Sequence, residues 1–207
     1  MTMIYIESNR GVFALTLLLL VGSAQVALGQ QCLGRPLESG EQTIAARIDL
    51  ERFVTVSAEY SRVGENVAWH ALAGVAADEL IPPGEFEPAF GGGLAWSGLH
   101  RVFCPAVSFQ TFKRPAGDDR LTSVDIGVGM GRRLGEERVR GTAFLFPHQR
   151  LVDELETSRT EGWVEGGFAL RGERFWGLAV LGIQVGGYSP GEDVIDGSAR
   201  FASGVAF

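Results

Sequence analysis

One serine of the chain stands in a pattern that is typical of hydrolase nucleophiles. Residues 187–191 read GYSPG and match G-x-S-x-G, with Ser189 at the centre. In a hydrolase this motif joins a strand to a helix, and the catalytic histidine follows it along the chain. Here a strand pattern follows instead, and no histidine lies after His148. The motif therefore predicts a loop, and we assign no catalytic residue to it.

Metal and cofactor chemistry is equally poorly supported. The two cysteines and three histidines have no zinc-type spacing, which requires closely paired ligands. Gly127, Gly129 and Gly131 lack the spacing of a dinucleotide-binding loop and no helix follows them. Glycines at every second residue of a strand explain this series better. No metal and no cofactor are expected.

The first thirty residues have the pattern of an export signal. An apolar run at residues 11–21 (GVFALTLLLLV) follows Arg10, and small residues at Ala27 and Gly29 come after it. This pattern predicts a cleavable signal peptide at residues 1–29. The alternative is an uncleaved anchor, for which the run is short of the ~20 residues that a bilayer requires. Because export leads to an oxidising compartment, Cys32 and Cys104 are expected to form a disulfide.

Composition favours an all-β chain that does not bind nucleic acid. The 207 residues include 29 glycines, which suit long helices poorly. The formal net charge is -7 and Lys113 is the only lysine, whereas a nucleic-acid binder needs a basic face. With 45% hydrophobic residues, the chain has enough apolar material for one folded domain.

Alternation of apolar with small or polar residues predicts about ten strands. We place them at residues 43–50, 54–63, 67–78, 88–98, 101–113, 121–132, 138–148, 161–171, 174–186 and 198–207. If residues 43–62 form one long bent strand the count falls to nine, and a further merger would give eight. Pro105 cannot donate to a strand ladder, so we expect a bulge there.

The connections between these strands divide into two classes. Short ones are expected at 64–66, 98–100, 135–136 and 172–173, and they alternate with longer, mostly acidic ones at 80–87, 114–120, 149–160 and 187–197. This alternation is typical of an up-and-down antiparallel barrel, with tight turns at one end and loops at the other.

The two faces of the strands decide between a soluble barrel and a membrane barrel. In strand 121–132, Val124, Ile126 and Val128 share one face, and Asp125 lies on the other among glycines and a serine. A lumen filled by small residues and arginine–carboxylate pairs is typical of a transmembrane β-barrel. The residues expected to form this lumen charge network are Arg47, Asp49, Glu59, His70, Asp125, Arg140, Glu165 and Arg200.

The chain end, GSARFASGVAF, places Phe201, Val205 and Phe207 on one face of the last strand. This resembles the C-terminal strand of bacterial outer-membrane β-barrel proteins, and residues 43–207 resemble the small eight- to ten-stranded members by pattern. The resemblance implies a Gram-negative outer membrane, surrounding lipid, and recognition of the last strand by the barrel assembly machinery. It also implies that residues 30–42, the C-terminus and the short turns lie in the periplasm, with the long acidic loops outside.

Three functions are compatible with these patterns. The first is a non-enzymatic, monomeric outer-membrane barrel with a mostly closed, charged lumen and a structural or surface-interaction role. The second is a narrow channel or a small barrel enzyme acting on lipid A, for which His148, Ser158 and Glu161 are the candidate residues near the outer rim. The third is a soluble, secreted, lipocalin-like barrel with an apolar interior.

Overall fold

The computed structural model describes residues 37–77, 86–96, 103–114, 120–135, 140–154, 157–187 and 196–207. The predicted signal peptide at residues 1–29, together with Cys32 and Ser189, lies outside the described residues. Within them, no helix is long and apolar enough to cross a membrane.

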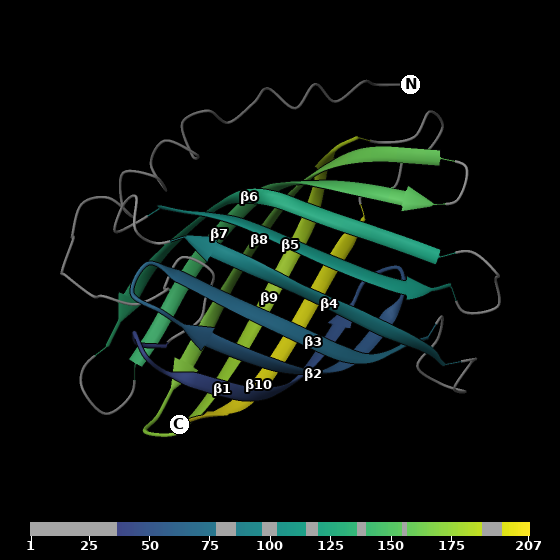
Figure 1. Cartoon of the computed structure of the whole chain (residues 1–207). Helices are drawn as coiled ribbons and strands as arrows, with labels where there is room; N and C mark the ends of the chain where they lie inside the picture. Colours follow the sequence, from purple (N-terminus) through teal and green to yellow (C-terminus); the bar gives the residue numbers. More distant parts are fainter. Residues whose placement is uncertain are drawn as a thin grey trace, which may run out of the picture.

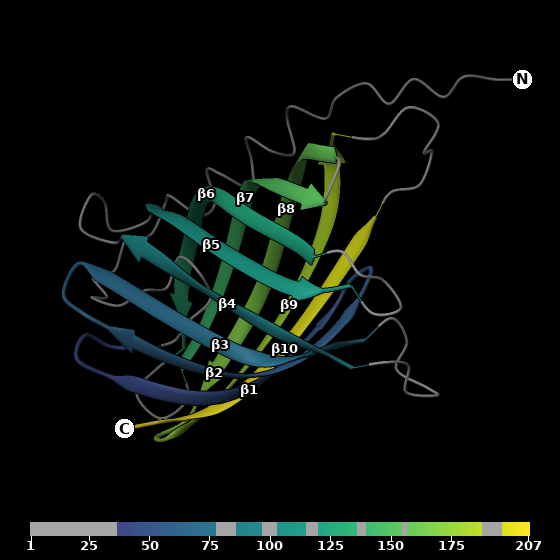
Figure 2. The same cartoon turned by 45° about the vertical axis from the view of Figure 1, so that its right-hand side comes forward.

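Ten antiparallel strands close into one barrel, as predicted (Figures 1 and 2). The strands are β1 (Gln42–Leu50), β2 (Val54–Val63), β3 (Val67–Ala77), β4 (Glu87–Trp96), β5 (Phe103–Lys113), β6 (Arg120–Leu134), β7 (Arg140–Glu154), β8 (Thr157–Arg171), β9 (Phe175–Gly186) and β10 (Gly197–Ala206). Each strand pairs with its neighbours in sequence, and β1 pairs with β10 from Thr43–Ala206 to Leu50–Ala199. The alternative counts of nine and eight are wrong, because residues 51–53 turn the chain between β1 and β2.

The barrel has two distinct ends. We call the end with the connections after β1, β3, β5, β7 and β9 the loop end, and the opposite end, where β10 finishes, the turn end. The strict alternation of loop lengths is wrong at two places: the β1–β2 connection at the loop end is short, and the loop expected at 149–160 is mostly strand. β7 and β8 instead continue as a long hairpin, because the alternation of inward Arg150 and Val152 with outward Leu151 continues past His148.

The outer face of the barrel is apolar on every strand. Ile44 is 56% exposed on β1, Phe90 53% on β4 and Leu181 67% on β9, and large exposed hydrophobic side chains occur on the other strands as well. The inner faces carry the buried charged residues, among them Arg47, Glu59 and Glu165. A soluble barrel has the opposite arrangement, and an exposed apolar surface on every strand is typical of a barrel surrounded by lipid.

The sheet is interrupted beside Pro147 and not, as predicted, at Pro105. Pairing of β5 with β6 continues in register through Pro105 and Val128, so the expected bulge is absent. On the other side the pairing with β4 ends at Ala95 and Ala106, so the missing N–H of Pro105 breaks no pairing there. The β6–β7 ladder is instead interrupted beside Pro147, and a register shift occurs at Gly162 and Trp163.

Gly127 supports the close approach of β6 to β7. A Cβ at this position would lie 2.4 Å from the Pro147 carbonyl oxygen and 2.5 Å from the His148 Cβ. A Cβ at Gly186 would meet nothing within 4 Å. Only the first position therefore depends on the absence of a side chain.

We expect Gly127→Ala to lower the free energy of unfolding by about 1–3 kcal/mol, because the added Cβ forces β6 and β7 apart. Gly186→Ala is the matched control and should change it by less than about 0.5 kcal/mol. Urea unfolding of the protein in lipid vesicles, followed by gel mobility, measures both. Equal effects of the two substitutions would contradict the close approach.

Candidate functional site: the charged lumen

Arg47 forms the first group of ion pairs in the lumen. Its Nε lies 2.7 Å from Asp49 Oδ2 on the same strand, and its Nη1 lies 3.3 Å from Glu59 Oε2 on β2. The side chains of Arg47 and Glu59 are 9% and 4% exposed. Strand periodicity explains the group, because residues 47 and 49 share the inward face of β1, and inward residue 59 comes from the adjacent strand.

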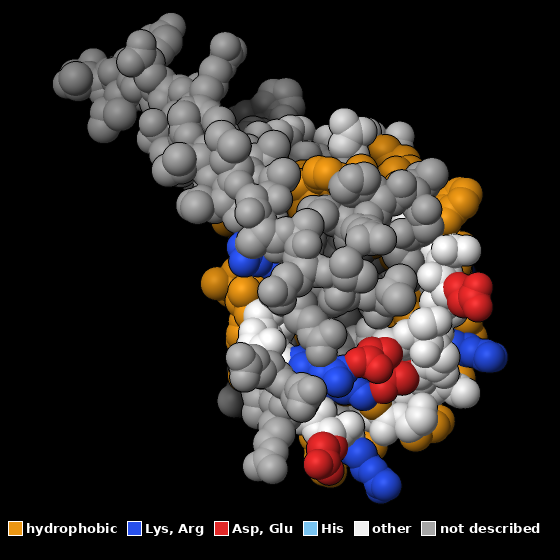
Figure 3. Space-filling view, turned by 90° about the vertical axis from the view of Figure 1, so that its left-hand side faces the viewer, with side chains coloured by type: hydrophobic (Ala, Val, Ile, Leu, Met, Phe, Trp, Pro, Cys, Tyr) orange, Lys and Arg blue, Asp and Glu red, His pale blue; other side chains and the backbone are white. Residues whose placement is uncertain are grey.

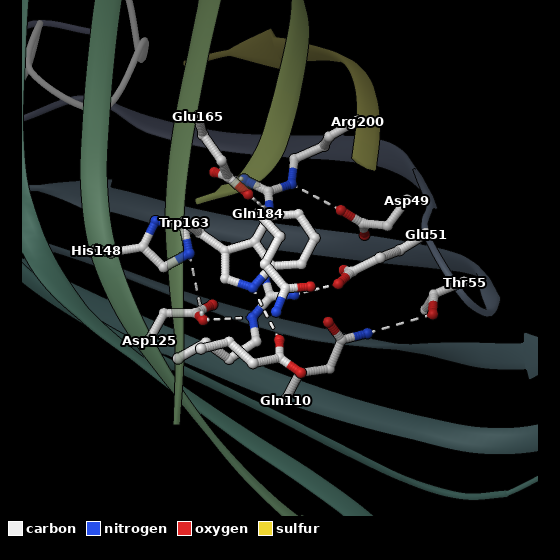
Figure 4. A network of polar contacts seen from close by, with 12 residues as sticks. Asp49, Glu51, Thr55, Gln110, Asp125, His148, Trp163, Glu165, Gln184 and Arg200 are labelled. Carbon is white, nitrogen blue, oxygen red and sulfur yellow. Dashed lines mark hydrogen bonds and ion pairs between the residues drawn. The ribbon is translucent and has the colours of Figure 1, made fainter. Parts of the chain in front are cut away.

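Arg200 connects this group to the wall formed by β8. Its Nε donates to Asp49 Oδ1 at 2.7 Å, and its Nη1 and Nη2 donate to the two carboxylate oxygens of Glu165 at 3.4 Å each (Figure 4). One guanidinium thus bridges carboxylates from β1 and β8 while its own backbone belongs to β10. The planar donor set of arginine allows such bridging, which the single ammonium of lysine does less well.

Arg150 organises a second group nearer the loop end. Its Nε donates to Asp125 Oδ1 at 2.7 Å, and its Nη1 pairs with Glu51 from the β1–β2 turn. The guanidinium carbon lies 4.7 Å from the centre of the Trp163 ring, which is a cation–π contact. Figure 4 shows how Asp125, Trp163 and Glu51 converge from different strands and a turn.

His148 lies beside this second group rather than at the rim. Its side chain is fully buried, and its Nε2 is 3.5 Å from Asp125 Oδ1. Its Nδ1 is 3.2 Å from the Phe146 carbonyl oxygen, and its ring stacks on that of Phe146. The expectation of a rim residue is therefore wrong, because β7 extends past His148 and leaves it within the barrel.

Glu161 joins Trp163 and Arg159 on the inward face of β8. Trp163 Nε1 donates to Glu161 Oε2 at 2.8 Å, and Arg159 Nε donates to Glu161 Oε1 at 2.6 Å. The Trp163 side chain is 2% exposed and fills the space between the two groups of charges. Both oxygens of Glu161 are thereby satisfied although the residue is buried.

Partial burial of Glu51 in the turn between β1 and β2 raises the pKa of its carboxyl above the ordinary value, and attraction to Arg150 opposes this increase. Glu51 therefore loses its charge at a higher pH than an isolated glutamate would, and the ion pair with Arg150 is lost with it.

A cavity of about 490 Å³ runs beside these ion pairs. Charged residues of both groups line it, and so do apolar residues from β5 to β9, including Phe112, Phe144 and Trp176. At the loop end an apolar cluster covers one side of the lumen, formed by Ala76, Ala89, Phe112, Leu121 and Val152, with Phe53 packed against it. The cavity is therefore lined by ion pairs on one part of its wall and by apolar side chains on another.

The eight residues predicted from the sequence do not all meet. Arg47, Asp49, Glu59, Glu165 and Arg200 form one connected group, Asp125 belongs to the group around Arg150, and His70 lines the cavity. Arg140 lies elsewhere: it is the first residue of β7, at the turn end, and pairs with Glu38. Placing Arg140 in the lumen network was wrong, because parity indicates a face of the sheet but not a height along the barrel.

Four lumen residues are not among those predicted from the sequence: Glu51, Arg150, Arg159 and Glu161. Arg150 and Arg159 were hidden by the loop expected at 149–160. The sequence does contain a signal for β8, because residues 159, 161 and 163 have the same parity as Glu165 and therefore share its inward face. Glu51 has no such signal, since it lies in a turn and its partner is on β7.

The candidate residues for acyl chemistry do not converge. His148 and Glu161 face the lumen, whereas Ser158 lies on the opposite, exposed face of β8. The described residues also contain no group of three or more histidine, cysteine or acidic residues that could hold a metal ion. Cys104 is fully buried on β5, and the disulfide with Cys32 stays a prediction.

Comparisons with known proteins give likenesses of fold alone. A scan against models of protein families finds no match, and a search of curated proteins finds none either. Among solved structures, the N-terminal β-barrel domain of Pseudomonas aeruginosa OprF is 12% identical with a TM-score of 0.39, covering 82% of this chain and 98% of that one. OmpT, an outer membrane protein of Vibrio cholerae in trimer form, is 10% identical with a TM-score of 0.35, covering 75% and 56%.

The class of the molecule follows from its own geometry. A closed barrel with an apolar exterior and a lumen occupied by buried ion pairs is a β-barrel of the membrane type.

We expect Arg47→Met to lower the free energy of unfolding by about 3 kcal/mol, because it leaves the buried Glu59 carboxylate without its arginine. Adding Glu59→Gln should recover part of this loss, since the buried carboxylate that has lost its arginine is then replaced by a neutral amide. Urea unfolding in lipid vesicles measures both variants.

The control for this pair is Lys113→Met, which breaks a more exposed pair with Glu87 at 3.7 Å. It should change the free energy of unfolding by less than about 1 kcal/mol. If the double variant at positions 47 and 59 is no more stable than Arg47→Met alone, Arg47 does not offset the cost of burying the Glu59 carboxylate.

Proposed function

We propose that the protein is a non-enzymatic barrel of the bacterial outer membrane, monomeric, with a charged lumen that is mostly closed at rest and a structural or surface-interaction role. One observation carries the proposal: large hydrophobic side chains are exposed outward on all ten described strands while the ion pairs lie inside. The soluble lipocalin-like alternative requires the reverse arrangement of faces.

The ends of the barrel also support a membrane position. Trp69 and Trp96 are exposed near the turn end, where Tyr60 contacts Trp69 at 5.3 Å between ring centres. Aromatic side chains at strand ends are typical of the lipid–water interface. The last strand presents Phe201, Val205 and Phe207 outward, 47%, 39% and 65% exposed. This face is available to lipid and, during biogenesis, to the assembly machinery.

The direction of insertion follows from the same proposal. With the turn end in the periplasm, segment 37–41 and the C-terminus lie on one side of the membrane, and the long β7–β8 hairpin projects on the outer side. Asp153, Ser158 and Thr160 are exposed near the tip of this hairpin. Its polar tip, together with the acidic connections at the loop end, provides the surface proposed for outside contacts. Export through residues 1–29 remains part of the proposal.

Fractionation of cells that express the full chain tests the membrane assignment. We expect the protein in the outer-membrane fraction, soluble only with detergent. Because a closed barrel resists unfolding by detergent at room temperature, unheated samples should migrate differently from boiled ones. Full solubility without detergent, with no difference in migration, would overturn the proposal.

A charge on the outer face gives a residue-level test. We expect Leu181→Arg, in the middle of β9, to lower the free energy of unfolding in vesicles by about 2–4 kcal/mol, because a charge there enters the hydrocarbon core. The matched control is Val67→Arg at the first residue of β3, where the cost should be about 0–1 kcal/mol. Equal tolerance of both substitutions is the outcome expected of a soluble barrel.

A further inference from the structure

The polar side of the lumen ends abruptly toward the turn end. On the inward faces of β1 and β2, Arg47 and Glu59 form the described ion pair nearest the turn end. Still nearer that end, the hydroxyls of Thr43 and Ser61 share a hydrogen bond of 2.7 Å. Beyond Arg47, buried apolar residues form one cluster, which consists of Leu37, Ala45, Val63, Ala68, Trp176, Ala202 and Ala206. Trp176 also lines the cavity, so this cluster is the floor of the cavity.

Leu37 differs from the other members of the cluster because it does not belong to the barrel wall. It precedes β1 and is 2% exposed, while its neighbours in the cluster come from β1, β2, β3, β9 and β10. Most of those neighbours are alanines, which leave the space that the leucine occupies. The sealing side chain therefore comes from a segment that precedes the ten strands.

Segment 37–41 is held in the mouth by its backbone and by two ion pairs. Gly40 N–H donates to the Val63 carbonyl at 2.8 Å, and Val63 N–H donates to the Glu41 carbonyl at 3.0 Å. Gly40 has a φ of +91°, which a residue with a side chain rarely adopts. The Glu41 carboxylate pairs through both oxygens with the Arg171 guanidinium of β8, and Glu38 pairs with Arg140 of β7.

These two ion pairs cross the mouth from the β1 side to β7 and β8. Figure 3 shows the turn end, where basic and acidic side chains meet and hydrophobic side chains lie around the edge. The Glu41 and Arg171 side chains are 24% and 8% exposed, so the pair sits at the boundary between water and the apolar cluster. The Glu41–Arg171 pair thus adds two charge-assisted hydrogen bonds to those that the backbone of the segment makes.

The lumen behind this seal carries an excess of negative charge. Among the described residues that line the cavity, seven are carboxylates and five are arginines. Four of these arginines, Arg47, Arg150, Arg159 and Arg200, are engaged in the ion pairs described above, and the carboxylates outnumber all five arginines by two, so the formal charge of this lining is negative. A narrow, low-dielectric passage with surplus carboxylates favours cations over anions.

We propose that segment 37–41 is the gate of a small-cation pathway through the lumen, with Leu37 as its hydrophobic seal and the Glu41–Arg171 and Glu38–Arg140 pairs as its latch. This proposal rests on the proposed function, since it requires a membrane-spanning barrel. With the segment seated, the apolar cluster excludes water and blocks ions. When the latch opens, water enters at Trp176 and joins the cavity to the turn end, and monovalent cations pass along the carboxylates.

Planar-bilayer recordings of the full chain in a potassium chloride gradient test the gate. The wild-type protein should be closed most of the time. Glu41→Gln and Arg171→Gln each break the same pair, and each should raise the open fraction about tenfold, as expected for the loss of a charge-assisted interaction. Leu37→Asn should raise it further, because a polar side chain wets the seal. The reversal potential should show preference for potassium over chloride.

The matched control is Glu65→Gln, which removes the same charge from an exposed glutamate at the turn end. It should leave the open fraction unchanged. Each sample is also checked for heat-dependent gel migration, which reports the folded barrel. The proposal of a gate is wrong if all three variants form barrels but pass no more current than the wild type: Glu41→Gln, Arg171→Gln and Leu37→Asn. Current with chloride preference overturns the cation pathway, and absence of a barrel in the wild type overturns the proposed function instead.

Discussion

Pairing of the first strand with the last is the constraint on which the other features depend. A backbone N–H or C=O exposed to hydrocarbon costs several kcal/mol, so strands can cross a membrane only when no edge is left open. The β1–β10 ladder removes both edges, and it joins the inward faces that carry Asp49 and Arg200. Closure of the sheet therefore also brings together the Asp49–Arg200 ion pair. The outward face is then free to be apolar throughout, because no backbone polar group remains there.

The choice of arginine in the lumen follows from the cost of burying charge. An isolated charge is strongly destabilising away from water, and an ion pair offsets that cost only when its donors and acceptors are nearly all satisfied. Arg47, Arg150 and Arg200 each contact two carboxylates, and Arg150 also covers the face of Trp163. Lysine presents a compact point charge and lacks this planar set of donors. The single lysine of the chain, Lys113, is accordingly found in a more exposed pair at the loop end.

The sequence was most informative about strands and faces, because the period of two is local and repeats along each strand. The predicted bounds of 54–63 match β2, and the small-residue face of 121–132 up to Gly127 is the inward face of β6. Partners across the barrel could not be predicted in the same way. Arg150 and Glu51 are 99 residues apart, and the Glu41–Arg171 pair spans 130. Their meeting depends on the closure and stagger of the whole sheet, which no local pattern encodes.

The four tryptophans of the chain are divided evenly by the barrel wall. Trp69 and Trp96 point outward, 38% and 51% exposed, whereas Trp163 and Trp176 are enclosed in the lumen, 2% and 5% exposed. Indole emission depends on the polarity around the ring, so the molecule contains two natural sets of fluorophores, one in contact with lipid and one with the interior. Brominated lipids would quench only the outer pair. The remaining emission would then report on hydration inside the barrel without any added label.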